Sequence, residues 1–169
     1  MRIRILFAFP ILLLFLGVIH AQSDRDGLRG IPTVKVTIHV SGDDGRLNQD
    51  QLRADIETRL RKAGVRISDD DDSVLLQAMV TCLHGPWQFP PNVRNQRGGS
   101  FDLYAFNVSL DLDRAVTVGV GRDSRVVSGT VWSRAAIGLQ LTDIFANTVR
   151  NLIGELTDVF ANDFLVVNR

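Results

Sequence analysis

The chain has 169 residues, in which 19 lysine and arginine residues balance 19 aspartate and glutamate residues. This neutral balance argues against a nucleic-acid-binding protein, which concentrates basic side chains on one face. Cys82 is the only cysteine, so the chain can form no intramolecular disulfide and hydrophobic packing must hold its fold. The length fits one domain.

The first 21 residues have the pattern of a secretory signal peptide. Two arginines precede an apolar run over residues 5–19, and Ala21 offers a small residue at the cleavage position. An uncleaved membrane anchor is the alternative, but the run is shorter than the roughly 18 residues that a spanning helix needs, and Pro10 interrupts it. We therefore expect a cleaved signal peptide over residues 1–21, a mature chain that does not span the membrane, and a periplasmic or secreted location.

The mature chain is expected to begin with a flexible lead-in over residues 22–31, followed by a single α/β domain over residues 32–169. Apolar and polar residues alternate from Val34 to Ser41, which predicts a half-buried strand. A helix then begins with Asn48 as its N-cap, carries an apolar residue at every fourth position, and ends at Gly64.

The segment from Val74 to Leu83 has a denser apolar pattern, typical of an interior strand buried on both faces. Four aspartates at positions 69–72 precede it and invite a calcium hypothesis. They lack the glycine and the distal glutamate of a calcium loop, which favours a solvated turn. We therefore predict no metal site and no cofactor. Cys82 lies in this strand and is expected to be a buried thiol rather than a reactive one.

Residues 84–100 contain three prolines and three glycines without helical or strand periodicity, which predicts a long loop. Loops of this length tend to be functional or disordered. Trp87 and Phe89 lie here beside Arg94 and Arg97, so one hypothesis is a recognition loop with aromatic anchors and a basic tip. The alternative is a flexible connector whose aromatic side chains pack against the edge of the domain.

Two further strands are predicted beyond this loop. Strict alternation begins at Tyr104, and the strand should continue through a bulge at Arg114-Ala115 to Val118. A hairpin turn then leads into a strand over residues 125–133, after which residues 135–139 should lead out of the sheet.

An apolar stripe at helical spacing predicts a long packing helix from about Thr142 to Leu165. Gly154 in its middle costs helix stability, and we expect it to allow close approach to the sheet. The element order is then β-α-β-β-β-α. It predicts an α+β two-layer sandwich, with about four strands in a mixed sheet and two helices on one face.

Two helices on one face leave the other face of the sheet uncovered. His39 of the first strand and Asp111 of the third would lie on this uncovered face. The pair could carry out acid–base chemistry, yet no nucleophile or third orienting group accompanies it. A solvated sheet face produces the same alternation of polar residues.

The element order, closed by the segment Phe160-Ala-Asn-Asp-Phe-Leu-Val-Val-Asn168, resembles that of small uncharacterised bacterial exported proteins. The layout from about Pro32 to Asn168 is also similar, more distantly, to two envelope families. These are the lipopolysaccharide-assembly lipoprotein of the outer membrane and the N-terminal domain of the periplasmic Tol translocation protein. The resemblance implies binding to partners in the envelope rather than catalysis, although this chain lacks the lipidated cysteine of the lipoprotein.

Two functions remain open from the sequence. In the first, the protein is a non-enzymatic binding or accessory module of the bacterial cell envelope. Its 84–100 loop and uncovered sheet face would contact an envelope protein or a glycolipid. In the second, it is a small hydrolase or ligand carrier that uses the sheet face around His39 and Asp111. We expect the first function, and no nucleic-acid partner in either case.

Overall fold

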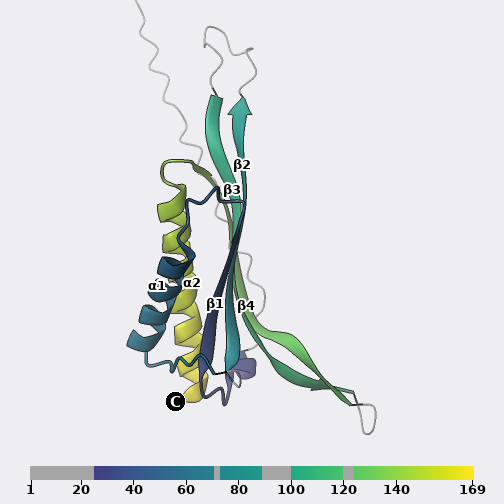
Figure 1. Cartoon of the computed structure of the whole chain (residues 1–169). Helices are drawn as coiled ribbons and strands as arrows, with labels where there is room; N and C mark the ends of the chain where they lie inside the picture. Colours follow the sequence, from purple (N-terminus) through teal and green to yellow (C-terminus); the bar gives the residue numbers. More distant parts are fainter. Residues whose placement is uncertain (1–24, 71–72, 89–99, 120–123) are drawn as a thin grey trace, which may run out of the picture.

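The computed structural model describes residues 25–70, 73–88, 100–119 and 124–169. The elements, in chain order, are η1 (Arg25–Leu28), β1 (Val34–Ser41), α1 (Gln49–Lys62), β2 (Val74–Gln88), β3 (Ser100–Val118), β4 (Arg125–Leu141) and α2 (Phe145–Asn168). The four strands form one sheet in the order β1-β2-β3-β4, and α1 and α2 cover the same face of it (Figure 1). The predicted α+β fold, with a mixed four-stranded sheet and two helices on one face, is confirmed.

The local signals for α1 act as predicted. The Asn48 side chain accepts a hydrogen bond of 3.0 Å from the backbone N–H of Gln51, which satisfies one of the free amides of the first turn. At the other end, Gly64 has a φ of 89°, and the N–H of Val65 donates to the carbonyl of Leu60 at 2.9 Å. A left-handed glycine therefore ends the helix and turns the chain back toward the sheet.

The sheet combines one parallel and two antiparallel pairings. β1 and β2 run parallel, with α1 as their crossover, whereas β2, β3 and β4 are antiparallel neighbours. The register of β3 against β4 shifts between Leu112 and Asp113. This irregularity lies slightly before the bulge that the sequence placed at Arg114-Ala115.

Three strand ends differ from the predictions. β2 continues to Gln88 although a loop was expected from residue 84, β3 begins at Ser100, and β4 includes residues 135–139, which were expected to lead out of the sheet. Each of these strand ends is determined by how far the neighbouring strand continues to pair with it. Pro86 fits in β2 because β1 ends opposite Thr81, so that side of β2 needs no N–H donor there.

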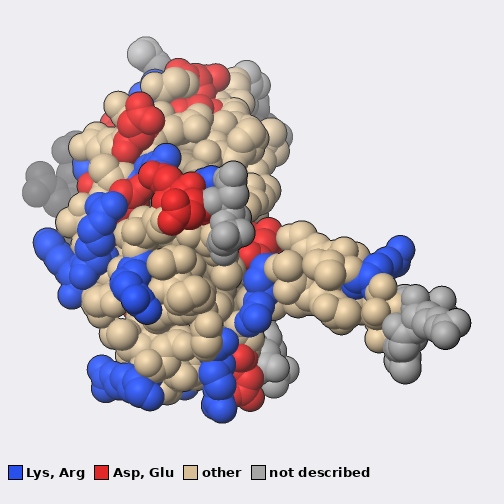
Figure 2. Space-filling view, turned by 60° about the horizontal axis from the view of Figure 1, so that its bottom comes forward, with Lys and Arg blue, Asp and Glu red and all other residues tan. Residues whose placement is uncertain are grey.

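The long strands extend the sheet beyond the helices at both ends, as two-stranded ribbons (Figure 1). One ribbon is formed by the end of β2 and the start of β3. The other, called the β3–β4 arm below, consists of residues 114–118 of β3 and residues 125–130 of β4. It projects from the body of the molecule in the space-filling view (Figure 2).

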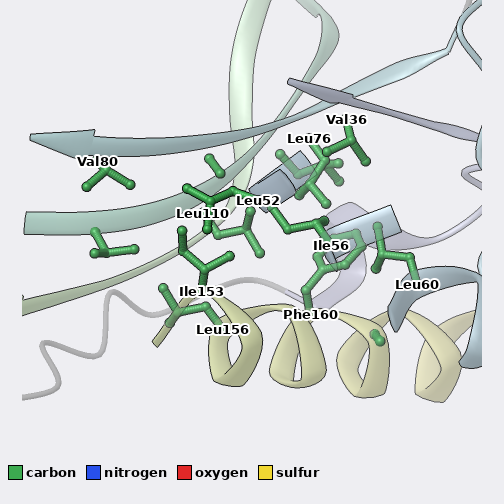
Figure 3. Packing of buried hydrophobic residues seen from close by; sticks show 14 of the residues in the cluster. Val36, Leu52, Ile56, Leu60, Leu76, Val80, Leu110, Ile153, Leu156 and Phe160 are labelled. Carbon is green, nitrogen blue, oxygen red and sulfur yellow. The ribbon is translucent and has the colours of Figure 1, made fainter. Parts of the chain in front are cut away.

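The hydrophobic core fills the space between the sheet and the two helices (Figure 3). Its largest fully buried side chains are Trp132, Tyr104, Phe145 and Phe160. Exposed ion pairs also join the helices, with 2.7 Å between Arg59 and Asp158 and 2.6 Å between Arg150 and Asp55. α2 contributes ten buried residues to the packing against three from α1, in agreement with its apolar stripe.

The residues around η1, which lie within the segment 22–31 predicted as a lead-in, contact the domain. The side chain of Leu28 is fully buried. The Asn168 side chain donates to the Leu28 carbonyl at 2.9 Å and accepts from the Gly30 N–H at 2.8 Å. The C-terminal end of α2 and the segment around η1 are therefore fastened to each other.

None of the helices in the described part of the chain is both long enough and apolar enough to cross a bilayer. The predicted signal peptide over residues 1–21 lies outside the described residues.

Candidate binding surface

The face of the sheet turned away from the helices is divided into an apolar half and a polar half. Side chains alternate between the two faces of a strand, so the unburied positions of each strand define the uncovered face. The pairing register brings its apolar members together on three adjacent strands. This apolar half consists of Leu83 of β2, Leu103 and Ala105 of β3, and Ile137, Leu139 and Leu141 of β4. At its border with the polar half, Ile137 pairs with Asn107, and Asn107 pairs with Thr81.

The apolar half is largely accessible to solvent. Leu83 is 75% exposed and Ile137 is 53% exposed. Leu83 pairs across the sheet with Ala105, which in turn pairs with Leu139, so these side chains form one continuous row. β2 is indeed an interior strand of the sheet, but the prediction that it is buried on both faces is wrong, because Met79 and Leu83 are exposed and both described α-helices lie on the other side (Figure 1).

The polar half contains the predicted residues His39 and Asp111. Asp111 accepts a hydrogen bond of 2.8 Å from the Ser109 hydroxyl and a second one from the hydroxyl of Ser133. His39 is opposite Met79, and Met79 is opposite Ser109, so β2 separates the strands of His39 and Asp111. No hydrogen bond or ion pair joins this pair among the described residues, and the Asp111 carboxylate is occupied by two serines.

A different polar cluster lies on the helix-covered face, where the turn after β1 meets β2 and β3. The Asp44 carboxylate accepts a hydrogen bond of 3.0 Å from the Tyr104 hydroxyl and lies 2.9 Å from Nδ1 of His84. The guanidinium of Arg46 donates to the Tyr104 hydroxyl at 3.1 Å. The Tyr104 ring is stacked between His84 and Phe145, with centroid distances of 4.4 and 4.0 Å.

The contacts of Asp44, Arg46 and His84 with Tyr104, called the Tyr104 clamp below, have a structural role. Burial raises the pKa of the Tyr104 hydroxyl, and the hydrogen bond to Asp44 raises it further. The phenol thus stays protonated and serves as a hydrogen-bond donor. Each side chain of the cluster is engaged by another member, and the contacts hold the β1–α1 turn against the sheet.

Two hollows lie outside the apolar half. A cavity of about 80 Å³ lies between the first turns of the helices, with Arg46 and Arg150 in its lining. A groove of about 540 Å³ lies at the base of the β3–β4 arm, where Leu75, Asp113 and Val126 contribute to its walls. Asp113 accepts a hydrogen bond from the Thr130 hydroxyl at this point.

The recognition-loop residues are mostly beyond the part of the chain that the structure describes. The backbone of Trp87 belongs to β2 and pairs with Phe101, whereas Phe89, Arg94 and Arg97 lie outside the described residues. Within the described ranges, no group of three or more histidine, cysteine, aspartate or glutamate side chains is placed to hold a metal ion.

No protein-family model matches the chain, and no curated protein matches it. Among solved structures, a minor lipoprotein from Acinetobacter baumannii is 12% identical with a TM-score of 0.38, and the match covers 80% of this chain and 94% of that one. A homolog of a neuraminyllactose-binding hemagglutinin from Helicobacter pylori is 8% identical with a TM-score of 0.40, covering 83% and 85%. The rare lipoprotein B from Shewanella oneidensis is 16% identical with a TM-score of 0.30, covering 78% and 91%.

Bacterial lipoproteins are thus among the solved structures that resemble the chain, in keeping with the weak resemblance expected from the sequence. Likenesses of this size do not transfer a function. The function must therefore be inferred from the surfaces of this chain.

The apolar half was not predicted from the sequence, although its members are visible in the alternation of the strands. Leu83 belongs to the dense apolar pattern from Val74 to Leu83, which was interpreted as a strand buried on both faces. Ile137, Leu139 and Leu141 alternate as strand residues do, but the strand was expected to end before them. The sequence feature that could have indicated the Tyr104 clamp is the acidic pair Asp43-Asp44 in the turn after β1.

Proposed function

We propose that this protein is a non-enzymatic binding module of the bacterial cell envelope and that it binds an envelope protein through the apolar half of its uncovered sheet face. The observation that supports this proposal most strongly is the row of apolar side chains from Leu83 through Ala105 to Leu139, with the exposed Ile137 beside Leu139 on β4. Contiguous apolar surface of this kind is typical of interaction sites. The predicted signal peptide supports the envelope location.

Energetics favour a partner that covers the row as a whole. Complete burial of one leucine or isoleucine side chain contributes roughly 1.5–3 kcal/mol. Leu83 and Ile137 already stand on a rigid sheet, so their ordering costs little further entropy on binding. We therefore expect these two side chains to dominate the contact.

A protein partner fits this surface better than a glycolipid does. Phosphate-bearing headgroups are bound by clustered arginine and lysine side chains. In the described strands of the sheet body, the basic side chains of the uncovered face are Lys35 and His39, both on β1 and neither in the apolar half. Neither of the two hollows described above lies in this half, whereas small ligands and acyl chains are held in concave sites.

The proposal keeps the 84–100 segment as a second contact region. Trp87 follows Leu83 on the same strand, so the segment that carries Phe89, Arg94 and Arg97 continues from the end of the sheet where the apolar half lies. Replacement of residues 89–99 by a short glycine–serine turn is expected to weaken partner binding, and unchanged binding would remove this segment from the proposal.

Site-specific photo-crosslinking in the native envelope tests the proposed surface. The photoreactive residue p-benzoylphenylalanine is placed at position 83 and, as a matched control, at position 58, which is exposed on α1. We expect one discrete protein adduct from position 83, none from position 58, and loss of the adduct when Ile137→Lys is added. Lipid adducts at position 83 would contradict a protein partner and indicate a glycolipid instead. Equal adducts at both positions, or none at position 83, would contradict the proposed surface.

A further inference from the structure

The β3–β4 arm is a two-stranded ribbon with both edges unpaired among the described strands. The last pairing between β2 and β3 joins Leu75 to Asp113, so residues 114–118 of β3 have β4 as their sole neighbour. β4 is the last strand of the sheet, and its outer edge has no strand beside it. Two-stranded ribbons are only marginally stable in water unless something else packs on them.

The arm also carries exposed valines. Val118 of β3 is 48% exposed, whereas Val116 and Val127 form a cross-strand pair that is partly buried. Val126, on β4, is 69% exposed. The described arm residues between Arg114 and Arg125 carry no charge, and Figure 2 shows the arm as largely uncharged surface. Uncharged, exposed edge strands are templates for pairing with another strand.

The segment around η1 covers the outer edge of β4 at Val131, where the unpaired part of this edge begins. Gly27 packs so closely on β4 that a Cβ atom at this position would lie 2.8 Å from the carbonyl oxygen of Val131. The guanidinium of Arg114 donates to the carbonyl of Gly27 at 3.3 Å and fixes the segment there. The edge of β4 is therefore covered at Val131 but remains open from Arg125 to Thr130.

We propose that the β3–β4 arm joins two copies of this chain, with the open β4 edges paired antiparallel over residues 125–129. A symmetric contact uses the same segment in both copies, and a two-fold axis at Val127 places Arg125 of one copy opposite Gly129 of the other. The two Arg125 side chains then lie about 14 Å apart at opposite ends of the paired segment, farther than the screening length of about 8 Å in physiological salt.

The charge pattern selects this pairing over the alternatives. Parallel pairing in register would place Arg125 against Arg125, which is unfavourable. The remaining residues of the segment are uncharged, so an identical strand meets no like charge along the rest of the paired edge. The contact lies at the other end of the sheet from the apolar half and is independent of the proposed function.

Sedimentation equilibrium of the chain from residue 22 onward tests the proposal. We expect a dimer whose dissociation constant rises at least tenfold in Val126→Lys, because the two introduced lysines would lie about 7 Å apart on the same face, within the screening length. Leu83→Lys is the matched control, because it places the same charge on another exposed strand position, and it should leave the dimer intact. Circular dichroism confirms that both variants fold.

A wild-type chain that stays monomeric at every concentration would overturn the proposal. A dimer that Val126→Lys does not weaken, or that Leu83→Lys weakens equally, would overturn it as well. The photo-crosslink from position 83 should persist in Val126→Lys, so failure of the dimer and failure of the proposed function give different results.

Discussion

Cys82 carries the single thiol of the chain, and its environment makes that thiol unreactive. The residue is 4% exposed on β2, and burial raises its pKa to about 11, with the carboxylates of Asp43 and Asp44 contributing in the same direction. The thiolate is the nucleophile, so at pH 8 roughly one molecule in a thousand is reactive. The thiol therefore behaves as a small apolar side chain of the core.

We predict that iodoacetamide leaves Cys82 of the folded protein unmodified at pH 8 and modifies it rapidly in urea. Because the folded pKa is raised, any residual rate in the folded state should increase as the pH rises toward 11. The control is the double variant Cys82→Ala, Leu83→Cys, which moves the thiol to the adjacent exposed position. Mass spectrometry follows the reaction, and equal rates for the two folded proteins would show that Cys82 is accessible.

Gly138 of β4 is required by the aromatic ring that lies over it. A Cβ atom at this position would be 2.4 Å from Cζ of the buried Phe106 ring, which packs edge-on against Phe145. Gly138→Ala must displace this ring, and we expect a loss of about 1–3 kcal/mol in the free energy of unfolding. Gly85→Ala is the control, since a Cβ atom there meets no neighbour. Urea denaturation gives both values, and equal stabilities would contradict the packing.

Among the elements, η1, β4 and α2 are joined by one buried carboxylate. Asp163 of α2 accepts a hydrogen bond of 3.2 Å from the Trp132 indole and lies 2.9 Å from the Arg25 guanidinium. Arg134 is a more distant partner, at 3.9 Å. A buried carboxylate is tolerated because these donors surround it, and its removal leaves the buried Trp132 N–H without this acceptor.

We expect Asp163→Ala to lower the free energy of unfolding by about 1–3 kcal/mol, because the buried Trp132 N–H loses its acceptor while the half-exposed Arg25 can be hydrated. Asp158→Ala on the same helix is the matched control, because it breaks the exposed pair with Arg59 and should cost at most about 1 kcal/mol. Chemical denaturation measures both variants. Similar small losses would mean that Asp163 does not hold the three elements together.

Gly154 of α2 marks the crossing of the two helices. From the sequence we expected this glycine to allow close approach to the sheet, but a Cβ atom there would lie 2.8 Å from the guanidinium of Arg59 on α1. Because Arg59 is flexible and can move away, Gly154→Ala should be neutral or stabilising, with a helix-propensity gain of about 1 kcal/mol. In an Arg59→Ala background the full gain should be measured. A clear loss in that background would show that backbone packing requires the glycine.

At the scale of the whole molecule, the sequence predicted which face of the sheet each strand residue lies on better than it predicted where the strands begin and end. Alternation places Val108 and Leu110 in the core because it is a local property of the chain. The ends of β2 and β4 depend on pairing with residues far away in sequence, such as Leu139 with Ala105, which no local pattern contains. The apolar half was missed for this reason.

The two ends of the described domain lie close together, so the chain can be circularly permuted. Asn168 binds both Leu28 and Gly30, and Arg25 reaches Asp163. A glycine–serine linker of about 8 residues, with a mean reach of roughly 15 Å, can therefore join Arg169 to Arg25. New termini between Gln88 and Ser100 fall between two paired strands and cut neither of them.

We predict that this permutant folds with an unfolding midpoint in urea close to that of the parent chain. A second permutant, opened between Asp43 and Asp44, should be strongly destabilised, because Asp44 and Arg46 clamp the Tyr104 hydroxyl from this turn. Circular dichroism during denaturation compares the two proteins. Equal stabilities would show that the clamp contributes little, whereas failure of the first permutant alone would show that the β2–β3 connection is needed to bring its strands together.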